Sequence, residues 1–160
     1  MGDALAVACM HAKGFTKEDF ARSHPGGALG RRLLTHVRDV MRTGDAVPCV
    51  KEDISVLDAV REITKKHIGM TAVVNADNVV TGIFTEGDLR RLIEKRGDIR
   101  AIPIAEVMTK TPRTIEADAM AAAAARILEE TLVNQLLVAD KAWHPVGALH
   151  LHDLMTAKVI

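Results

Sequence analysis

The chain has 160 residues, of which 48% are hydrophobic and 2% aromatic, and its 21 basic residues balance its 21 acidic residues. This length fits one domain or two small ones around an aliphatic core, and the balanced charge argues against a nucleic-acid binder that relies on phosphate neutralisation. Cys9 and Cys49 lack the spacing of a metal site and indicate reduced thiols. The apolar run at residues 4–10 is too short to cross a membrane. We therefore expect a soluble, cytoplasmic protein that binds neither nucleic acid nor membranes.

The first 36 residues predict two helices and a glycine-rich loop. Residues 1–13 are alanine-rich and predict a helix that Gly14 ends, and residues 16–19 have the pattern of a capping box for a second helix. Residues 24–32 place three glycines beside a proline, and such a loop lets the backbone approach a ligand closely. The loop lacks the Gly-Lys-Ser/Thr ending of a phosphate-binding P-loop. This loop is either part of a ligand site or an interdomain turn. Because the first helix begins almost at residue 1, we expect the chain to be a fragment of a longer protein.

From Val37 onwards the chain repeats itself. Residues 39–41 (Asp-Val-Met) match residues 106–108 (Glu-Val-Met), and each match is followed by the same predicted order of strand, helix, strand, strand and helix. The predicted strands are residues 47–50, 70–75 and 79–85 in the first copy and residues 112–115, 136–139 and 146–151 in the second. The predicted helices are residues 56–63, 86–96, 120–128 and 153–158.

The duplication predicts how the two copies fold together. A β-α-β-β-α unit of about 60 residues is too small to cover both faces of its own sheet, whereas two copies can bury those faces against each other. We predict an α+β fold with pseudo-twofold symmetry, in which residues 1–36 precede a first repeat at residues 37–98 and a second at residues 99–160. Symmetry-related clefts are expected where strand ends meet helix N-termini.

The strongest functional signal lies in residues 82–91, where a predicted strand runs into a predicted helix. Thr85 and Asp88 are three residues apart and face the first turn of that helix, whose unpaired N–H groups favour an anion. Asp88 can also accept hydrogen bonds from sugar hydroxyls. The same Thr-x-x-Asp pattern is a capping box, which starts a helix without any ligand. The two roles are compatible.

These residues resemble the signature of paired CBS (cystathionine β-synthase) domains. Gly82, Thr85, Asp88, Leu89 and Arg91 match the pattern Gly-apolar-x-Thr/Ser-x-x-Asp-apolar-x-Arg in order, and the resemblance extends from residue 37 to residue 159. In that family the clefts of the paired domains commonly bind adenosine or other nucleotides. The resemblance implies that Asp88 holds ribose hydroxyls and that Thr85, with the helix N-terminus, faces phosphate.

A weaker copy of the signature occupies residues 147–154. Asp153 is retained, but His150 stands where the hydroxyl residue should be, and it can offer a charged or hydrogen-bonding contact to an acidic ligand. His150 and His152 alternate on the predicted strand as two metal ligands would, yet they have no third ligand nearby in sequence, so we favour a pairing or core role and predict no metal site. The candidate ligand-binding residues are Thr71, Thr85, Asp88, Arg91, His150 and Asp153.

The leading segment resembles a second family. Residues 23–31, which follow residues 2–7, are similar to the end of the sugar isomerase (SIS) domain of arabinose-5-phosphate isomerases, and residues 150–154 are similar to the ending of those enzymes. These enzymes place a CBS pair after the SIS domain and interconvert ribulose 5-phosphate and arabinose 5-phosphate on the way to Kdo and lipopolysaccharide. The resemblance implies that His24 is an active-site residue of the full-length isomerase. We expect no isomerase activity from this chain alone, because the phosphate-binding sheet would precede residue 1.

Two functions of different kinds follow from these resemblances. The first is a regulatory module that needs no cofactor and senses a small phosphorylated effector; the pathway favours CMP-Kdo, and the family favours an adenine nucleotide. The second is a scaffold that binds no ligand and holds the SIS domain in a homodimer or tetramer through the alanine-rich residues 120–128. A CBS pair from a transporter or from a dehydrogenase of nucleotide synthesis is disfavoured by residues 23–31.

Overall fold

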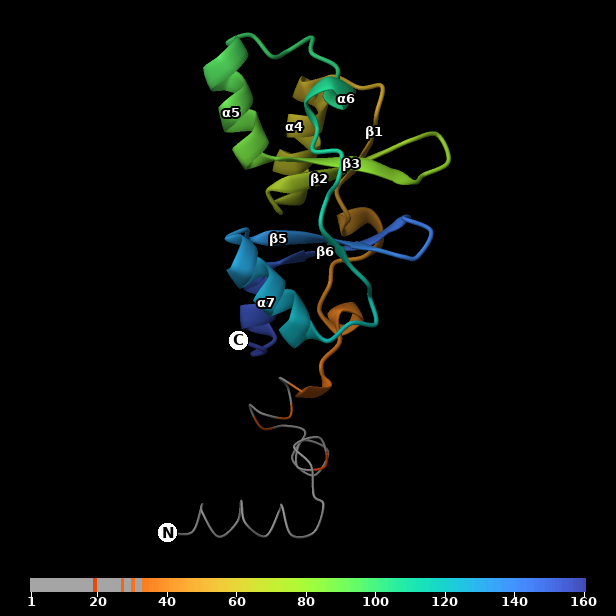
Figure 1. The fold of residues 1–160 in the computed structure, drawn as a ribbon, viewed down its shortest axis with the longest axis vertical. Coiled ribbons are helices and arrows are strands. Elements are labelled where there is room, and N and C mark those ends of the chain that lie inside the picture. Colours follow the sequence, from red (N-terminus) through yellow and green to blue (C-terminus); the bar gives the residue numbers. More distant parts are fainter. Residues whose placement is uncertain (1–18, 20–26, 28–29, 31–32) are drawn as a thin grey trace.

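The computed structural model describes Asp19, Gly27, Gly30 and residues 33–160. Of the two predicted N-terminal helices and the loop that holds His24, only Asp19, Gly27 and Gly30 are among these described residues, and His24 is not. Two β-sheets are stacked on each other, and helices lie on the outer side of each sheet (Figure 1). Among the described residues, no helix combines the length and apolar character needed to cross a membrane.

The predicted β-α-β-β-α order is confirmed in both repeats. The first repeat contains β1 (Cys49–Lys51), α4 (Val56–Lys66), β2 (Met70–Val74), β3 (Val80–Thr85) and α5 (Glu86–Arg96). The second contains β4 (Thr114–Ile115), α7 (Ala121–Thr131), β5 (Gln135–Ala139), β6 (Pro145–His150) and α8 (Leu151–Thr156). Two short 3-10 helices, η1 (Val37–Asp39) and η2 (Gly44–Ala46), precede β1 in the first repeat, and the short helix α6 (Ile104–Val107) precedes β4 in the second.

Local sequence signals set several of these boundaries. The Ser55 side chain caps α4 by accepting a hydrogen bond from the Asp58 backbone N–H, and α5 ends at Gly97, whose positive φ of 69° suits glycine. One boundary differs from the prediction. The strand β6 ends at His150 and α8 starts at once with Leu151, so His152 belongs to a helix and does not alternate with His150 on a strand.

The two sheets have the same topology and the same irregularity. In each, the first strand pairs in parallel with the second, and the second pairs antiparallel with the third. A register shift follows Val73 in β2 and Val138 in β5, which are equivalent positions at an offset of 65 residues. Because β2 is buried along its whole length between the other sheet and the helices, its sequence is apolar apart from Thr71 and does not alternate.

The segment before the first strand of each repeat packs on the other repeat. Arg42, which precedes β1, pairs with Ala148 of β6 through two backbone hydrogen bonds of 2.8 and 3.1 Å. Thr109, which precedes β4, pairs with Ile83 of β3 through bonds of 2.8 and 2.9 Å. Gly82 permits this approach, because a Cβ there would lie 2.7 Å from Met108 Sδ and 2.8 Å from the Thr109 carbonyl oxygen. The two repeats are therefore joined by exchanged segments as well as by their stacked sheets.

Candidate ligand site

Thr85 and Asp88 form the predicted capping box at the start of α5. The Thr85 hydroxyl accepts a hydrogen bond from the Asp88 backbone N–H at 3.1 Å, and Asp88 Oδ2 accepts bonds from the Thr85 backbone N–H at 2.9 Å and from the Thr85 hydroxyl at 2.7 Å. Arg91 Nη2 donates to the other carboxylate oxygen, Oδ1, at 2.6 Å. Three signature residues thus meet, and Asp88 has hydrogen bonds on both of its oxygens.

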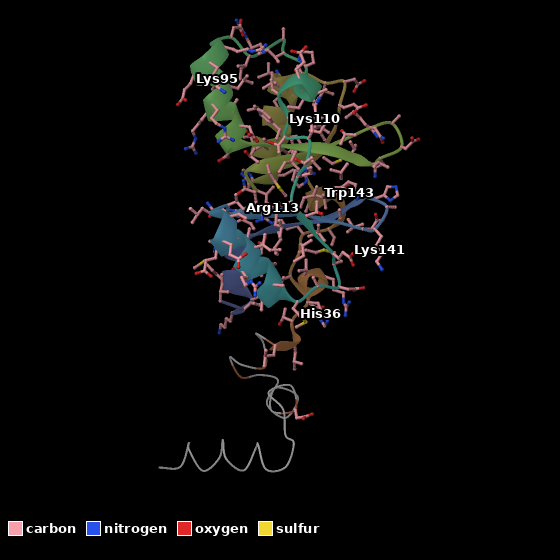
Figure 2. The ribbon with its side chains drawn as sticks, viewed as in Figure 1. His36, Lys95, Lys110, Arg113, Lys141 and Trp143 are labelled. Carbon is pink, nitrogen blue, oxygen red and sulfur yellow. The ribbon has the colours of Figure 1, made fainter. Side chains whose placement is uncertain are left out.

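A shallow, basic hollow adjoins Asp88. It has a volume of about 250 Å³, and its lining includes Asp88, Arg91, Lys95 and Arg96. The Arg91 side chain is 64% exposed, whereas that of Asp88 is 14% exposed. Lys95 lies farther along α5 (Figure 2). The exposed guanidinium can therefore turn away from Asp88 at small cost, which would leave a carboxylate acceptor beside several cations.

His150 and Asp153 form the equivalent arrangement at the start of α8. Asp153 Oδ2 accepts a hydrogen bond from the His150 backbone N–H at 2.9 Å, and His150 Nδ1 accepts one from the His152 backbone N–H at 3.1 Å. The imidazole thus takes the capping role that the Thr85 hydroxyl has in the first repeat.

Arg42 distinguishes the second arrangement from the first. Its Nε and Nη2 lie 3.2 and 3.3 Å from the two oxygens of Asp153, and the side chains are only 27% and 19% exposed. Its Nη1 donates to the backbone carbonyls of Lys66 and His67 at the end of α4, at 3.2 and 3.4 Å. Arg42 is not among the site residues predicted from the sequence. The only sequence signal at this position is that it directly follows residues 39–41, where the repeated motif begins. The equivalent residue in the second repeat is Thr109, which has no charge.

The two capped helix starts lie at the same end of the stacked sheets, opposite the hairpin turns (Figure 1). Gln135 Nε2 donates to the Gly69 carbonyl at 3.4 Å, and this same carbonyl accepts the Glu86 backbone N–H at 3.1 Å. Gln135 is itself paired with His150 across β5 and β6. A chain of backbone and side-chain contacts therefore links the start of α5 to the start of α8.

Thr71 is placed differently from the other candidates. Its side chain is fully buried in β2, and its hydroxyl donates to the Ala72 carbonyl at 3.3 Å. A ligand could reach it only if the strand moved. Within the described part of the chain, His, Cys, Asp and Glu side chains form no group of three or more suited to a metal ion.

Comparisons with known proteins identify the repeats. Residues 37–95 and 104–160 match the CBS domain family. The whole chain is 48% identical to an arabinose 5-phosphate isomerase KdsD of Pseudomonas aeruginosa and 47% identical to one of Escherichia coli, and it spans 49% and 48% of those two proteins. The chain therefore covers about half the length of these relatives.

Solved structures share the fold. The CBS domain pair of protein MJ0100 in complex with 5′-methylthioadenosine and S-adenosyl-L-methionine superposes with a TM-score of 0.68 at 20% identity, over 76% of this chain and 94% of that one. CBSX2 in complex with AMP superposes with a TM-score of 0.65 at 25% identity, over 77% of this chain and 95% of that one. This chain belongs to the CBS domain family, as a CBS pair homologous to part of the KdsD arabinose 5-phosphate isomerases.

Proposed function

We propose that this chain is the effector-sensing module of an arabinose 5-phosphate isomerase, and that its effector is a small phosphorylated nucleotide or nucleotide sugar. The observation that carries the proposal is the pair of equivalent acid-capped helix starts, Thr85 with Asp88 and His150 with Asp153, at one end of the stacked sheets. Two CBS pairs of the same fold are described as complexes with AMP and with 5′-methylthioadenosine and S-adenosyl-L-methionine, which supports a nucleotide-like ligand. Kdo and lipopolysaccharide synthesis, the pathway that the resemblance implies, makes CMP-Kdo a candidate beside adenine nucleotides.

At the first position, ribose hydroxyls would donate to the Asp88 carboxylate. Arg91 would then leave Asp88 for the ligand's phosphate, helped by Lys95 and Arg96, which line the same hollow. This exchange conserves charge pairing, because the carboxylate keeps hydrogen-bond donors and the guanidinium gains an anion. Thr85 would hold Asp88 in place through the capping box.

At the second position, the ligand would have to share Arg42 with Asp153. A phosphate or carboxylate group can take the guanidinium as a bidentate partner, and ribose hydroxyls can replace it on Asp153. The Arg42 side chain also donates to the end of α4, and its backbone pairs with Ala148 of the second repeat. Movement of Arg42 would therefore strain both contacts. A ligand that binds one arrangement of Arg42 more tightly than the other would thereby regulate the catalytic part of the enzyme.

Calorimetric titration of the chain with CMP-Kdo, CMP, AMP and ATP tests the proposal. Asp88→Asn and Asp153→Asn should each remove or weaken one binding event, and Asp98→Asn is the matched control, because Asp98 is an exposed carboxylate paired with Arg100 at 2.9 Å. Absence of heat from all four compounds at millimolar concentration would defeat the proposal. The isomerase reaction would belong to the full-length enzyme, and we expect none from this chain alone.

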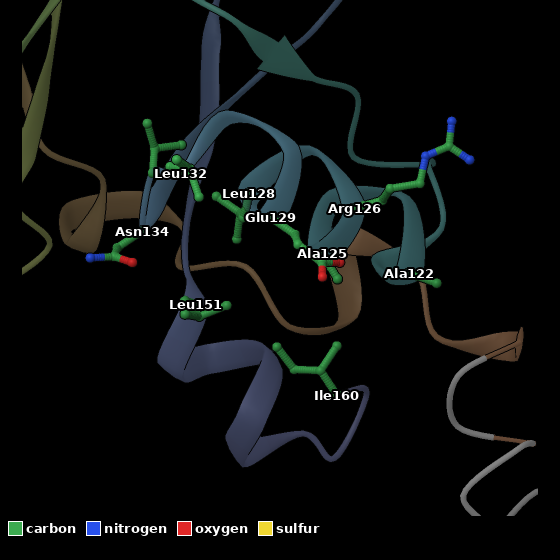
Figure 3. Close-up of a pocket in the computed structure, with 10 residues that line it drawn as sticks. Ala122, Ala125, Arg126, Leu128, Glu129, Leu132, Asn134, Leu151 and Ile160 are labelled. Carbon is green, nitrogen blue, oxygen red and sulfur yellow. The ribbon is translucent and has the colours of Figure 1, made fainter.

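The second candidate function is a ligand-free scaffold. It draws support from an apolar hollow beside α7 and α8, where the side chains of Leu132 and Ile160 are 92% and 49% exposed (Figure 3). Double substitution of Thr85→Ala and Asp88→Ala separates the two functions: a sensor loses its ligand, whereas a scaffold keeps its assembly and changes in no other way.

A further inference from the structure

Each of the two capping aspartates is paired with one arginine, but the two arginines come from different parts of the chain. At the first position, Asp88 is paired with Arg91, three residues later in the same helix. At the second position, Asp153 is paired with Arg42, which lies 111 residues away in the segment before β1. The residue of the second repeat that is equivalent to Arg91 is Thr156. The symmetry of the two repeats therefore includes the carboxylates but not their cations.

The guanidinium of Arg42 has two separate sets of acceptors. Its Nε and Nη2 face the oxygens of Asp153 at 3.2 and 3.3 Å, and its Nη1 donates to the backbone carbonyls of Lys66 and His67 at 3.2 and 3.4 Å. These carbonyls belong to the C-terminal end of α4, where the helix dipole favours a cation. The backbone of Arg42 is also fixed, by its two hydrogen bonds with Ala148. The guanidinium can therefore lose Asp153 and still be held at the second position by α4.

Arg91 is held much more weakly than Arg42. Its side chain is 64% exposed, against 27% for Arg42, so it can move from Asp88 into water. A pair that involves so exposed a side chain contributes little free energy. A ligand that takes the Asp88 carboxylate therefore displaces a solvated cation. A ligand that takes Asp153 instead leaves a partly buried guanidinium without its charged partner.

We propose that Arg42 makes the second position selective for ligands that carry an acidic group, whereas the first position also accepts neutral ligands. A phosphate or carboxylate group of the ligand replaces Asp153 on Nε and Nη2 of Arg42, and the ligand's hydroxyls replace Arg42 on Asp153. A neutral nucleoside supplies the hydroxyls alone, so the guanidinium loses a charged acceptor and gains none. This selectivity rests on the proposed function, and it defines which ligands each position accepts.

The strength of the selectivity follows from the different burial of the two arginines. A hydrogen-bonded, partly buried charged partner contributes about 10–100-fold to binding, so Arg42 should raise the preference for a nucleotide over its nucleoside by that factor. Arg91 is exposed, and its contact with phosphate should contribute less than about fivefold. At one concentration, the nucleotide should therefore fill both positions, whereas the nucleoside should fill the first position alone.

Calorimetric titration with AMP and adenosine, and with CMP and cytidine, measures this preference. The Asp88→Asn variant isolates the second position and Asp153→Asn isolates the first, so each gives a ratio of the association constants of nucleotide and nucleoside. The ratio cancels the cost of freeing the aspartate, because both ligands meet that cost. Adding Arg42→Gln to Asp88→Asn should lower the ratio by about 10–100-fold. The matched control, Arg91→Gln added to Asp153→Asn, should lower it by less than about fivefold.

Titration of the wild-type chain gives a test that does not depend on the stability of any variant. Two molecules of nucleotide should bind per chain, but one molecule of nucleoside at the same concentration. A wild-type chain that binds two nucleosides as readily as two nucleotides, or a ratio that Arg42→Gln leaves unchanged, overturns the selectivity and leaves the proposed function intact. Binding of both compounds at the first position alone has the same consequence. Absence of binding by all four compounds overturns both the proposed function and the selectivity.

Discussion

Arg42 and Asp153 are 111 residues apart in sequence and form a bidentate ion pair, with Arg42 Nε and Nη2 at 3.2 and 3.3 Å from the two carboxylate oxygens. The pair joins the segment before β1 in the first repeat to the start of α8 in the second. Because Arg42 also donates to the carbonyls of Lys66 and His67, one guanidinium connects three parts of the chain. The equivalent position in the other repeat is Thr109, so this connection makes the two candidate ligand positions unequal.

Arg42→Gln should lower the free energy of unfolding by about 1–3 kcal/mol, because it leaves a largely buried carboxylate without its charged donor. The control is Arg91→Gln, which removes a guanidinium that is 64% exposed and should cost less than about 1 kcal/mol. Urea unfolding followed by circular dichroism measures both. Equal losses of unfolding free energy in the two variants would show that the Arg42–Asp153 pair stabilises the fold no more than the exposed Arg91–Asp88 pair does.

Thr85→Ala should destabilise the chain by about 1 kcal/mol, because α5 loses its capping oxygen. Thr85→Ser keeps that oxygen and should lie within a few tenths of a kcal/mol of the wild type. Thermal unfolding of the two variants checks the difference. If serine and alanine cost the same, the capping hydroxyl does not stabilise the helix.

Gly82→Ala should destabilise the chain by about 1–3 kcal/mol, because its Cβ would lie 2.7 Å from Met108 Sδ and 2.8 Å from a backbone carbonyl. Gly87 provides the contrast. A Cβ at Gly87, inside α5, would have its nearest neighbours at 3.5 Å, so Gly87→Ala should stabilise by about 0.5–1 kcal/mol through helix propensity. A Gly82→Ala variant as stable as the wild type would contradict the close packing of the exchanged segment.

Asp140 should make the stability of the fold depend on pH in the acidic range, because its pKa lies below the ordinary value of a carboxyl group. The backbone N–H of His144 and its side chain, with the Ala142 N–H, donate to this carboxylate and lower its pKa. Since the folded-state pKa is lower than the unfolded one, the stabilisation is present above the unfolded pKa and is lost as the pH falls through the folded pKa. Asp140→Asn should therefore flatten the decline in melting temperature between about pH 5 and pH 2. An unchanged acid slope would show that the turn does not depend on this charge.

The repeats and most of the caps could be predicted from the sequence, because they depend on local patterns. Ser55, Thr85 and Gly97 act on residues three or four positions away, and apolar spacing marks the helices and strands. The end of β6 was misplaced, since histidine is not a usual helix cap and His150 takes that role here through Nδ1.

The contacts between the repeats could not be predicted in the same way. The Arg42–Asp153 pair and the exchange of the leading segments depend on how the two sheets stack, and nothing in the adjacent residues specifies them. Thr71 was expected near a cleft because it enters a strand, but it shares a face of β2 with Val73, which packs in the core beneath the helices of the first repeat, and its side chain is fully buried. Binding at Asp88 and Asp153 stays a prediction, supported by the placement of the two carboxylates.

A crystal structure of the chain soaked with CMP-Kdo, and in parallel with AMP, tests the central claim most directly. If the ligand binds as proposed, the density places its hydroxyls within hydrogen-bonding distance of the Asp88 or Asp153 carboxylate. Arg91 or Arg42 is then turned onto the ligand's acidic group. Density for either compound at a location remote from both carboxylates, or none at saturating concentration, would contradict it.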